Sequence, residues 1–313
     1  MELDPQAKAF LEQVRDSGEP RIYELSAADV RVAVAPIAEL IGDGPAVETV
    51  EEVSIPVRDA EIAGRRYRPS GAHGTIVWLH GGGWVMDGIE SSDAMCRILA
   101  TSAAATVVSV DYRVAPEHPF PVPVDDCFDA LSWVAALDDS SPLVVGGDSA
   151  GGNMAAVCAL RARDRGGPSL AAQVLVYPAT DTDMATASYL EHGGDELLML
   201  GTAEMAWFFD QYLPNPADRE NPDVAPLRAE DLSGLPPAIV VVAEYDPLRD
   251  DGLRYGERLG AAGVDVTLLR YDDMPHLFFS FVNLFPTGND AVARVGLTIR
   301  ALIGDPPGES PEG

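Results

Sequence analysis

The chain has 313 residues, of which 47% are hydrophobic and 23% are charged, and its formal net charge is −29. So acidic a surface repels nucleic-acid phosphates and anionic membranes, and we therefore expect neither as a partner. No apolar run reaches the roughly 18 residues that a membrane span needs, so we expect no stable membrane anchor.

The cysteines and the first residues bear on the cellular compartment. Cys96, Cys127 and Cys158 form no C-x-x-C pair and lie among apolar neighbours, so we predict buried thiols rather than disulfides or metal ligands. Such sparse cysteines fit a reducing compartment. Residues 1–4 lack the basic region and following apolar core of a secretory signal. We therefore expect a cytoplasmic protein.

Residues 1–45 read as two amphipathic helices, which we assign to the N-terminal part of a helical cap. Asp4 and Pro5 supply an N-cap and a first-turn proline for the first helix. The second helix opens at Ser26 with a pattern close to a capping box. Pro36 lies inside its apolar stripe, where we expect a kink.

The remaining chain alternates between strands and helices. Residues 47–69 predict two antiparallel strands with a turn at Asp59-Ala60. Downstream, continuous apolar strands indicate a mostly parallel sheet of about eight strands, flanked by helices on both faces. We expect strands over residues 75–80, 105–112, 142–145, 171–177, 237–244 and 265–271. We expect helices over residues 90–104, 123–137, 153–163, 249–262 and 289–303. The core domain then spans residues 46–182 and 236–303.

Residues 183–235 interrupt this alternation, and we assign them to the second part of the cap, because such long insertions are usually functional. The aromatic cluster Trp207-Phe208-Phe209 either packs the cap onto the core or contacts a substrate, and both alternatives stay open. We name Trp207 and Phe208 as candidate substrate-binding residues. The last residues, 304–313, are rich in Pro, Gly and Glu and are expected to form a disordered tail.

The strongest functional signal is Gly147-Asp148-Ser149-Ala150-Gly151, which fits G-x-S-x-G between a buried strand and a long helix. A nucleophilic serine at such a strained turn stands clear of the sheet, and small neighbours let strand and helix approach closely. The helix N-terminus also directs free amides to the space beside Ser149. We therefore predict Ser149 as a nucleophile.

A serine hydroxyl needs a base to accept its proton, and histidine is the usual one. His276 follows the strand predicted at 265–271 through a short loop, 272–275, which places it at the sheet edge where α/β folds bind ligands. We predict His276 as the base. The other histidines fit loops, the cap or a structural role at a strand end: His73, His80, His118 and His192.

The base in turn needs a carboxylate to orient it. Asp246 directly follows the strand predicted at 237–244, at the same edge of the sheet, and is our candidate. Glu244 is the nearest competitor but lies at the strand end. We interpret Asp250 and Asp251, at the start of the next helix, as compensating the helix dipole.

Amide donors for an oxyanion come from the run His80-Gly81-Gly82-Gly83-Trp84 after the first strong core strand. Consecutive glycines let bare backbone approach a carbonyl oxygen. We name Gly82 and Gly83, together with the amide of Ala150, as oxyanion-hole donors, and we expect Trp84 to form a pocket wall.

Four motifs together resemble the hormone-sensitive-lipase-like bacterial esterases: residues 80–84, 111–121, 147–152 and 246–250. The resemblance covers roughly residues 1–303 and implies an α/β-hydrolase core with a helical cap. It also implies a catalytic triad of Ser149, Asp246 and His276, with oxyanion glycines at Gly82 and Gly83. Members of the family commonly carry Gly and then Phe after the histidine, whereas this chain has Leu277 and then Phe.

The resemblance implies hydrolysis of small carboxylic esters with short or medium acyl chains, with no metal or organic cofactor. Amidase, deacetylase and lactonase activity remain alternatives on the same triad, because pocket shape selects the leaving group.

Gibberellin receptors resemble the same family but have lost the catalytic histidine. The presence of His276 argues against a receptor role here. The acidic surface and modest aromatic cap favour soluble esters over lipid interfaces. Exposed edge strands would allow a homodimer.

Overall fold

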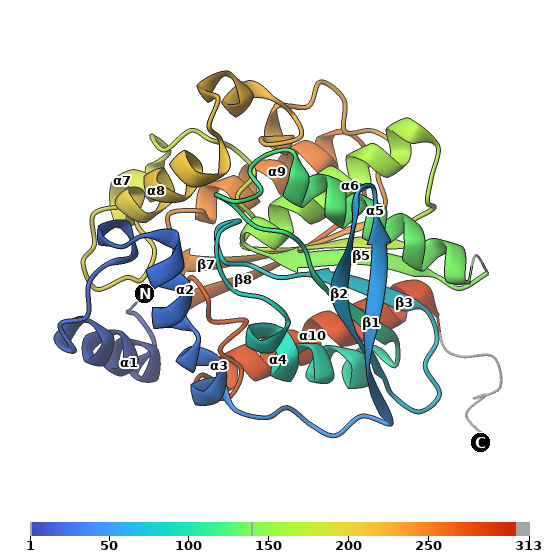
Figure 1. The fold of residues 1–313 in the computed structure, drawn as a ribbon, viewed down its shortest axis with the longest axis horizontal. Helices are drawn as coiled ribbons and strands as arrows, with labels where there is room; N and C mark the ends of the chain where they lie inside the picture. Colours follow the sequence, from blue (N-terminus) through green and yellow to red (C-terminus); the bar gives the residue numbers. More distant parts are fainter. Residues whose placement is uncertain (1, 139, 305–313) are drawn as a thin grey trace.

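An eight-stranded sheet, in the order β1-β2-β4-β3-β5-β6-β7-β8, forms the centre of the molecule in a computed structural model that describes residues 2–138 and 140–304 (Figure 1). The strands β1 and β2 pair antiparallel, as do β2 and β4, and all other neighbours are parallel. This confirms the expected fold class. The strands are β1 Thr49–Val57, β2 Ala60–Arg68, β3 Thr75–Leu79, β4 Thr106–Asp111, β5 Leu143–Asp148, β6 Ala172–Val176, β7 Ala238–Tyr245 and β8 Val266–Pro275.

Helices cover both faces of the sheet (Figure 1). Successive side chains of a strand point to opposite faces, so that Val144 belongs to the core cluster around α4 and α10 while Val145 belongs to the cluster around α5, α6 and α9. Burial on both faces explains why the central strands are apolar throughout. The five helices are α4 Ile89–Ala103, α5 Val122–Leu137, α6 Ala150–Arg165, α9 Arg249–Ala261 and α10 Pro286–Ile303.

The N-terminal segment contains three α-helices rather than the expected two. They are α1 Pro5–Asp16, α2 Ala27–Val34 and α3 Pro36–Ile41, with a short 3-10 turn η1 at Ile22–Glu24. The expected kink at Pro36 is a helix boundary, because proline fits the first position of a helix and does not fit its interior.

The insertion contains α7 Ala187–His192, α8 Thr202–Tyr212 and the 3-10 turns η2 Pro216–Glu220 and η3 Pro226–Arg228. It lies beside the N-terminal helices (Figure 1), and Arg21 joins the two segments. The Arg21 guanidinium donates to a buried Glu204 carboxylate at 2.7 Å and to the Leu198 carbonyl at 3.1 Å. We use the name cap for these two segments, residues 2–45 and 183–235.

Several boundaries differ from the sequence expectation. The residues 272–275, expected as a loop, continue β8 beyond a bulge, because Pro275 still pairs with Tyr245 of β7. Helix α6 begins three residues earlier than expected, directly after Ser149. Helix α10 begins at Pro286, with proline in its first turn. The expected tail lies outside the described residues from position 305 onward.

The three cysteines are free and buried, as predicted. Among the described helices, none combines the length and apolar character that crossing a membrane requires.

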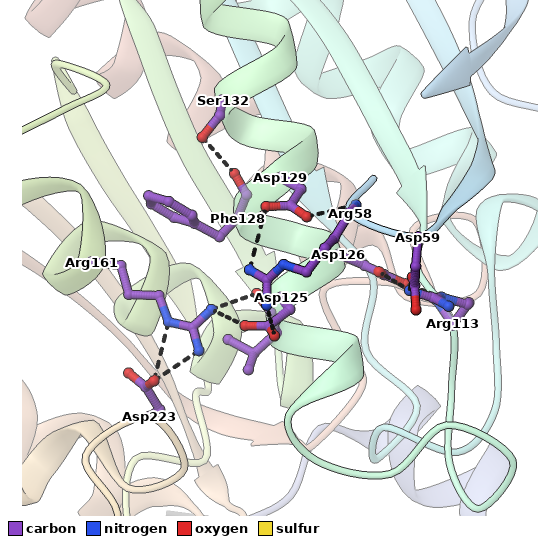
Figure 2. A network of polar contacts seen from close by, with 11 residues as sticks. Arg58, Asp59, Arg113, Asp125, Asp126, Phe128, Asp129, Ser132, Arg161 and Asp223 are labelled. Atoms are coloured by element: carbon purple, nitrogen blue, oxygen red, sulfur yellow. Dashed lines mark hydrogen bonds and ion pairs between the residues drawn. The ribbon is translucent and has the colours of Figure 1, made fainter. Parts of the chain in front are cut away.

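A network of ion pairs fastens the insertion to the core beside α5 and α6 (Figure 2). The Arg161 side chain, only 6% exposed, donates to Asp125 at 2.8 Å and to Asp223 at 2.7 Å. It also donates to the Val124 carbonyl oxygen at 3.2 Å. Because Asp223 belongs to the insertion, one guanidinium joins the cap to two core helices.

Replacing Arg161 with Ala should lower the free energy of unfolding by about 2 kcal/mol, because charge-assisted hydrogen bonds to two carboxylates are lost. Urea denaturation monitored by circular dichroism measures the change. Arg58, in the same network but 59% exposed, is the matched control. Arg58→Ala should cost less than about 1 kcal/mol, and equal losses for the two variants would contradict the role assigned to Arg161.

Candidate active site

Three parallel strands deliver the candidate triad to one edge of the sheet. Ser149 follows the end of β5, Asp246 follows the end of β7, and His276 follows the end of β8. The carboxyl ends of parallel strands meet at the same edge, which is where open α/β sheets bind ligands. The topology therefore brings together three residues that are far apart in the sequence.

The three side chains form one hydrogen-bonded chain. The Nε2 atom of His276 lies 3.0 Å from Ser149 Oγ, and its Nδ1 atom lies 2.7 Å from an Asp246 carboxylate oxygen. An ionised carboxylate can only accept, so Nδ1 carries the proton and donates to Asp246. The Nε2 lone pair is then free to accept the Ser149 hydroxyl proton, which is the arrangement of a general base beside a nucleophile.

The backbone at Ser149 is held in a sparsely populated conformation. Its φ is 56° and its ψ is −117°, and helix α6 begins at the next residue. A Cβ at Gly151 would overlap the carbonyl oxygen of Leu79, and a Cβ at Gly147 would overlap the backbone of Gly151. The Ser149 amide donates to the Val176 carbonyl at 2.9 Å, which anchors the turn to β6. The small residues of the motif are therefore required by backbone contact.

Asp246 is fully buried, and its second carboxylate oxygen accepts a hydrogen bond from the Leu248 amide at 2.8 Å. Its competitor Glu244 instead pairs with Arg249 at 2.5 Å and with Arg270 at 3.2 Å. The carboxylate of Asp246 is thus the one that faces His276.

The interpretation of Asp251 as a dipole-compensating residue is incomplete. Asp251 lies in the first turn of α9, but its side chain is fully buried and accepts hydrogen bonds from the amides of Thr180 and Asp181 at 2.9 and 3.0 Å. Asp250 likewise accepts from the Ser188 amide at 2.9 Å. Asp251 thus fastens the segment just before the insertion to α9, and Asp250 fastens the insertion itself, which helical position alone does not reveal.

The glycine run and Ser149 line one pocket. Gly82, Gly83 and Ala150 all line it. Gly82 has a φ of 93° and Gly83 a φ of 59°, in the left-handed region that favours glycine. A Cβ at Gly83 would also overlap the ring of Phe208 from the cap. The run is thus fixed in place by its neighbours.

His80 has a structural environment. Its ring is fully buried, stacks on Tyr112 with 4.1 Å between ring centroids, and donates from Nδ1 to the Gly81 carbonyl at 2.9 Å. Burial lowers the pKa of His80 to about 4, so the ring is neutral at pH 7. The Tyr112 hydroxyl donates to the His80 carbonyl at 2.7 Å. These contacts hold the backbone that leads into the glycine run.

The predicted substrate-binding aromatics separate into two groups. Trp84 and Phe208 line the pocket, and the Trp84 ring stacks on Tyr212 of the cap with centroids 4.7 Å apart. Trp207 is partly buried, packs against Phe208, and is not among the lining residues. The cap adds further apolar side chains to the wall, including Ile22, Val34, Ile37, Met199, Leu200 and Met205.

Leu277, next to the base, lines the pocket with a φ of 73°. A left-handed conformation is strained for a leucine, and such strain persists only where the surrounding structure imposes it. The Leu277 carbonyl accepts hydrogen bonds from the amides of Ser280 and Phe281, which closes the turn after His276. Leucine at this position adds a side chain to the pocket wall.

Two acidic residues of the pocket wall were not singled out from the sequence. Asp148 accepts hydrogen bonds from Trp78 Nε1 at 3.3 Å and Ser280 Oγ at 3.1 Å, and burial raises its pKa to about 6. Asp87 also lines the pocket. Asp148 lies inside the serine motif and Asp87 shortly after Trp84, so both lie near predicted site residues, but their place on the wall depends on the turns that carry them.

One group of side chains has the composition of a metal site. Glu191, His192 and Glu244 place one potential ligand atom each within 4.8 Å of one another. The Arg249 guanidinium already pairs with both carboxylates, at 3.1 and 2.5 Å. Because this positive charge balances the two acids, we assign no metal to the group.

Comparison with known proteins identifies the family. A family model for the alpha/beta hydrolase fold matches residues 76–280. The carboxylic ester hydrolase LipN of Mycobacterium tuberculosis is 42% identical over 273 residues, which cover 83% of this chain and 71% of that protein. An arylesterase of Saccharolobus solfataricus is 37% identical over 288 residues, covering 89% of this chain and 92% of that protein.

The solved structure of a hyperthermophilic esterase from the archaeon Pyrobaculum calidifontis superposes on this chain with a TM-score of 0.91 at 39% identity. The match covers 96% of this chain and 99% of that one. With a family model over most of the chain and relatives at this level of identity, the chain belongs to the hormone-sensitive-lipase-like esterases, a family with the α/β-hydrolase fold.

Proposed function

We propose that this chain, a carboxylic ester hydrolase by family, cleaves short- to medium-chain esters through an acyl-enzyme formed on Ser149. The observation that carries the proposal is the continuous hydrogen-bonded chain from Asp246 through His276 to Ser149 at the wall of an apolar pocket. The family's name and the names of the relatives fit the same chemistry.

In the first half-reaction, Ser149 Oγ attacks the ester carbonyl carbon while His276 Nε2 accepts the hydroxyl proton. The carbonyl π electrons move to oxygen, and the amides of Gly82, Gly83 and Ala150 stabilise this oxyanion. Asp246 holds the ring and stabilises the imidazolium. His276 then donates its proton to the leaving alcohol as the tetrahedral intermediate collapses to the acyl-enzyme.

In the second half-reaction, water enters and loses a proton to His276 Nε2 as its oxygen attacks the acyl carbon. The second tetrahedral intermediate collapses, the proton returns to Ser149 Oγ, and the carboxylic acid leaves. Every proton that His276 accepts is returned within one cycle. The chain's own residues are therefore sufficient for the whole sequence of steps.

The pocket supports the choice of small, largely apolar esters. Its wall includes aliphatic and methionine side chains of the cap, with Phe208 and Trp84 near the glycine run. Transfer of an acyl or alcohol chain from water to such a wall is favourable. Retention of the hydrogen-bonded His276 favours catalysis over a receptor role on this fold.

Replacing Ser149 with Ala should lower kcat for p-nitrophenyl esters by about a million-fold, because the nucleophile is removed while the fold is kept. The test is a series of p-nitrophenyl esters of increasing acyl length at neutral pH. Wild-type protein should show a maximum of kcat/KM at a short or medium chain. Hydrolysis by a folded Ser149→Ala variant at the wild-type rate would refute the assignment.

Replacing Asp246 with Asn should lower kcat by about 10⁴-fold, because an amide no longer holds the His276 tautomer that can accept the serine proton. Steady-state kinetics with the best ester of the series measures the effect. Glu244→Gln is the matched control, since that carboxylate pairs with arginines rather than with His276. An effect of Glu244→Gln as large as that of Asp246→Asn would contradict the assigned triad.

Replacing Leu277 with Gly or with Ala should shift the preferred acyl chain to greater length, because both substitutions remove the same part of the pocket wall. The free energy of unfolding of the Gly variant should also be about 1 kcal/mol higher than that of the Ala variant, because only glycine accepts a φ of 73° without strain. Ester kinetics and urea denaturation measure the two effects. An unchanged chain-length profile in both variants would place Leu277 outside the substrate's path.

A further inference from the structure

Asp87 is an unpaired carboxylate on the wall of the substrate pocket. Across residues 2–138 and 140–304, no group forms a hydrogen bond or an ion pair with it, and the charged neighbour that acts on it is Asp148. The residue nevertheless remains exposed toward the cavity that Ser149 and His276 line. An exposed carboxylate without a partner keeps both oxygens available to a bound ligand, which sets Asp87 apart from Asp148, the other acid on this wall.

The local backbone holds Asp87 beside the glycine run. Its φ is 68°, a conformation that aspartate and asparagine adopt more readily than most residues. A Cβ at Gly82 would come within 2.9 Å of the Asp87 Cβ, so Asp87 packs directly against a candidate oxyanion glycine. The side chain is therefore close to the position that a bound ester carbonyl would take.

The charges around the pocket have one sign. Among the described residues that line it, Asp87 and Asp148 are acidic and none is lysine or arginine. Asp148 is already engaged by Trp78 and Ser280, so only Asp87 has its acceptors free. Because the charge of Asp148 lies nearby, Asp87 would gain from a positively charged partner in the pocket. The net charge of −29 adds to the attraction for cations.

We infer that Asp87 is a specificity-determining residue that selects esters carrying an ammonium group and disfavours esters carrying a carboxylate. The inference rests on the proposed function, because it assigns a substrate class to the same pocket. A bound ammonium group supplies the positive partner that the Asp87 carboxylate lacks. It donates hydrogen bonds to the free oxygens of Asp87, or lies against them. A bound carboxylate instead adds a third negative charge beside Asp87 and Asp148.

The test compares two acetate esters of nearly equal shape, acetylcholine and 3,3-dimethylbutyl acetate, which differ in the charge of one atom. The readout is the ratio of their kcat/KM values, measured for wild type and for Asp87→Asn. Intrinsic ester reactivity and any general effect of the substitution cancel when the two ratios are divided. A matched pair with the charge in the acyl group, the phenyl esters of trimethylammonioacetate and of 3,3-dimethylbutanoate, covers the other half of the pocket.

We expect the ratio for at least one pair to fall about tenfold in Asp87→Asn, in line with the loss of one charge-assisted contact. Glu48→Gln removes one exposed surface charge and should leave both ratios unchanged, which separates a local effect from net charge. Asp87→Gly, which also fits the positive φ, provides a second variant if Asp87→Asn folds poorly.

The outcomes separate the two proposals. Equal ratios in wild type, Asp87→Asn and Asp87→Gly for both pairs would overturn the inference while leaving ester hydrolysis intact. Absence of Ser149-dependent hydrolysis of any ester by folded wild-type protein would overturn the proposed function instead. An equal fall with Glu48→Gln would assign the effect to overall charge and would also overturn the inference.

Discussion

The close contact between β3 and the first turn of α6 is the constraint on which the site depends. The α6 backbone passes so near the Leu79 carbonyl that no side chain fits at Gly151. The chain must therefore reverse sharply at Ser149, whose amide is held by Val176 on the neighbouring strand. A nucleophile mounted in this way has little freedom to move, so the base and the glycine run can be built around a fixed point.

The cap takes part in shaping the site as well as covering it. Phe208 packs against Gly83, and Tyr212 stacks on Trp84, so α8 supports the glycine run from one side. From the other side, Arg31 of α2 donates to the carbonyls of Val85 and Ala115 at 2.8 and 2.7 Å. The loop that would bind an oxyanion is therefore supported by both segments of the cap, and changes in the cap reach the chemistry through it.

Sequence reasoning was most effective where chemistry follows strand order. Ser149, Asp246 and His276 could be named because each follows an apolar strand, and parallel strands bring their ends to one edge. The extent of β8 could not be seen, because Asp272, Asp273 and Pro275 interrupt its apolar pattern and their pairing depends on a bulge opposite β7. Pro36 marked a real discontinuity, yet the choice between a kink and a helix boundary depended on packing.

Two further features were hidden for a different reason. The positive φ of Leu277 has no signature in residue type, and aspartate merely adopts such a φ more readily than most residues. Both residues closely follow predicted site residues, yet the face that each presents to the pocket depends on the conformation of its turn. The dipole interpretation of Asp251 was incomplete, because helix position does not reveal its complete burial or its bonds to Thr180 and Asp181 just before the insertion.

The bond between Arg21 and Glu204 joins residues 183 positions apart, and this separation has a consequence for how the protein matures. During synthesis the N-terminal segment leaves the ribosome long before α8 exists, because chains emerge from the N-terminus. Its apolar residues Val34, Ile37 and Ile41, which later face the pocket, then have no partner to cover them. The nascent chain thus exposes an apolar surface for a time. Chaperones have the greatest opportunity to bind it in the interval before the two segments of the cap meet.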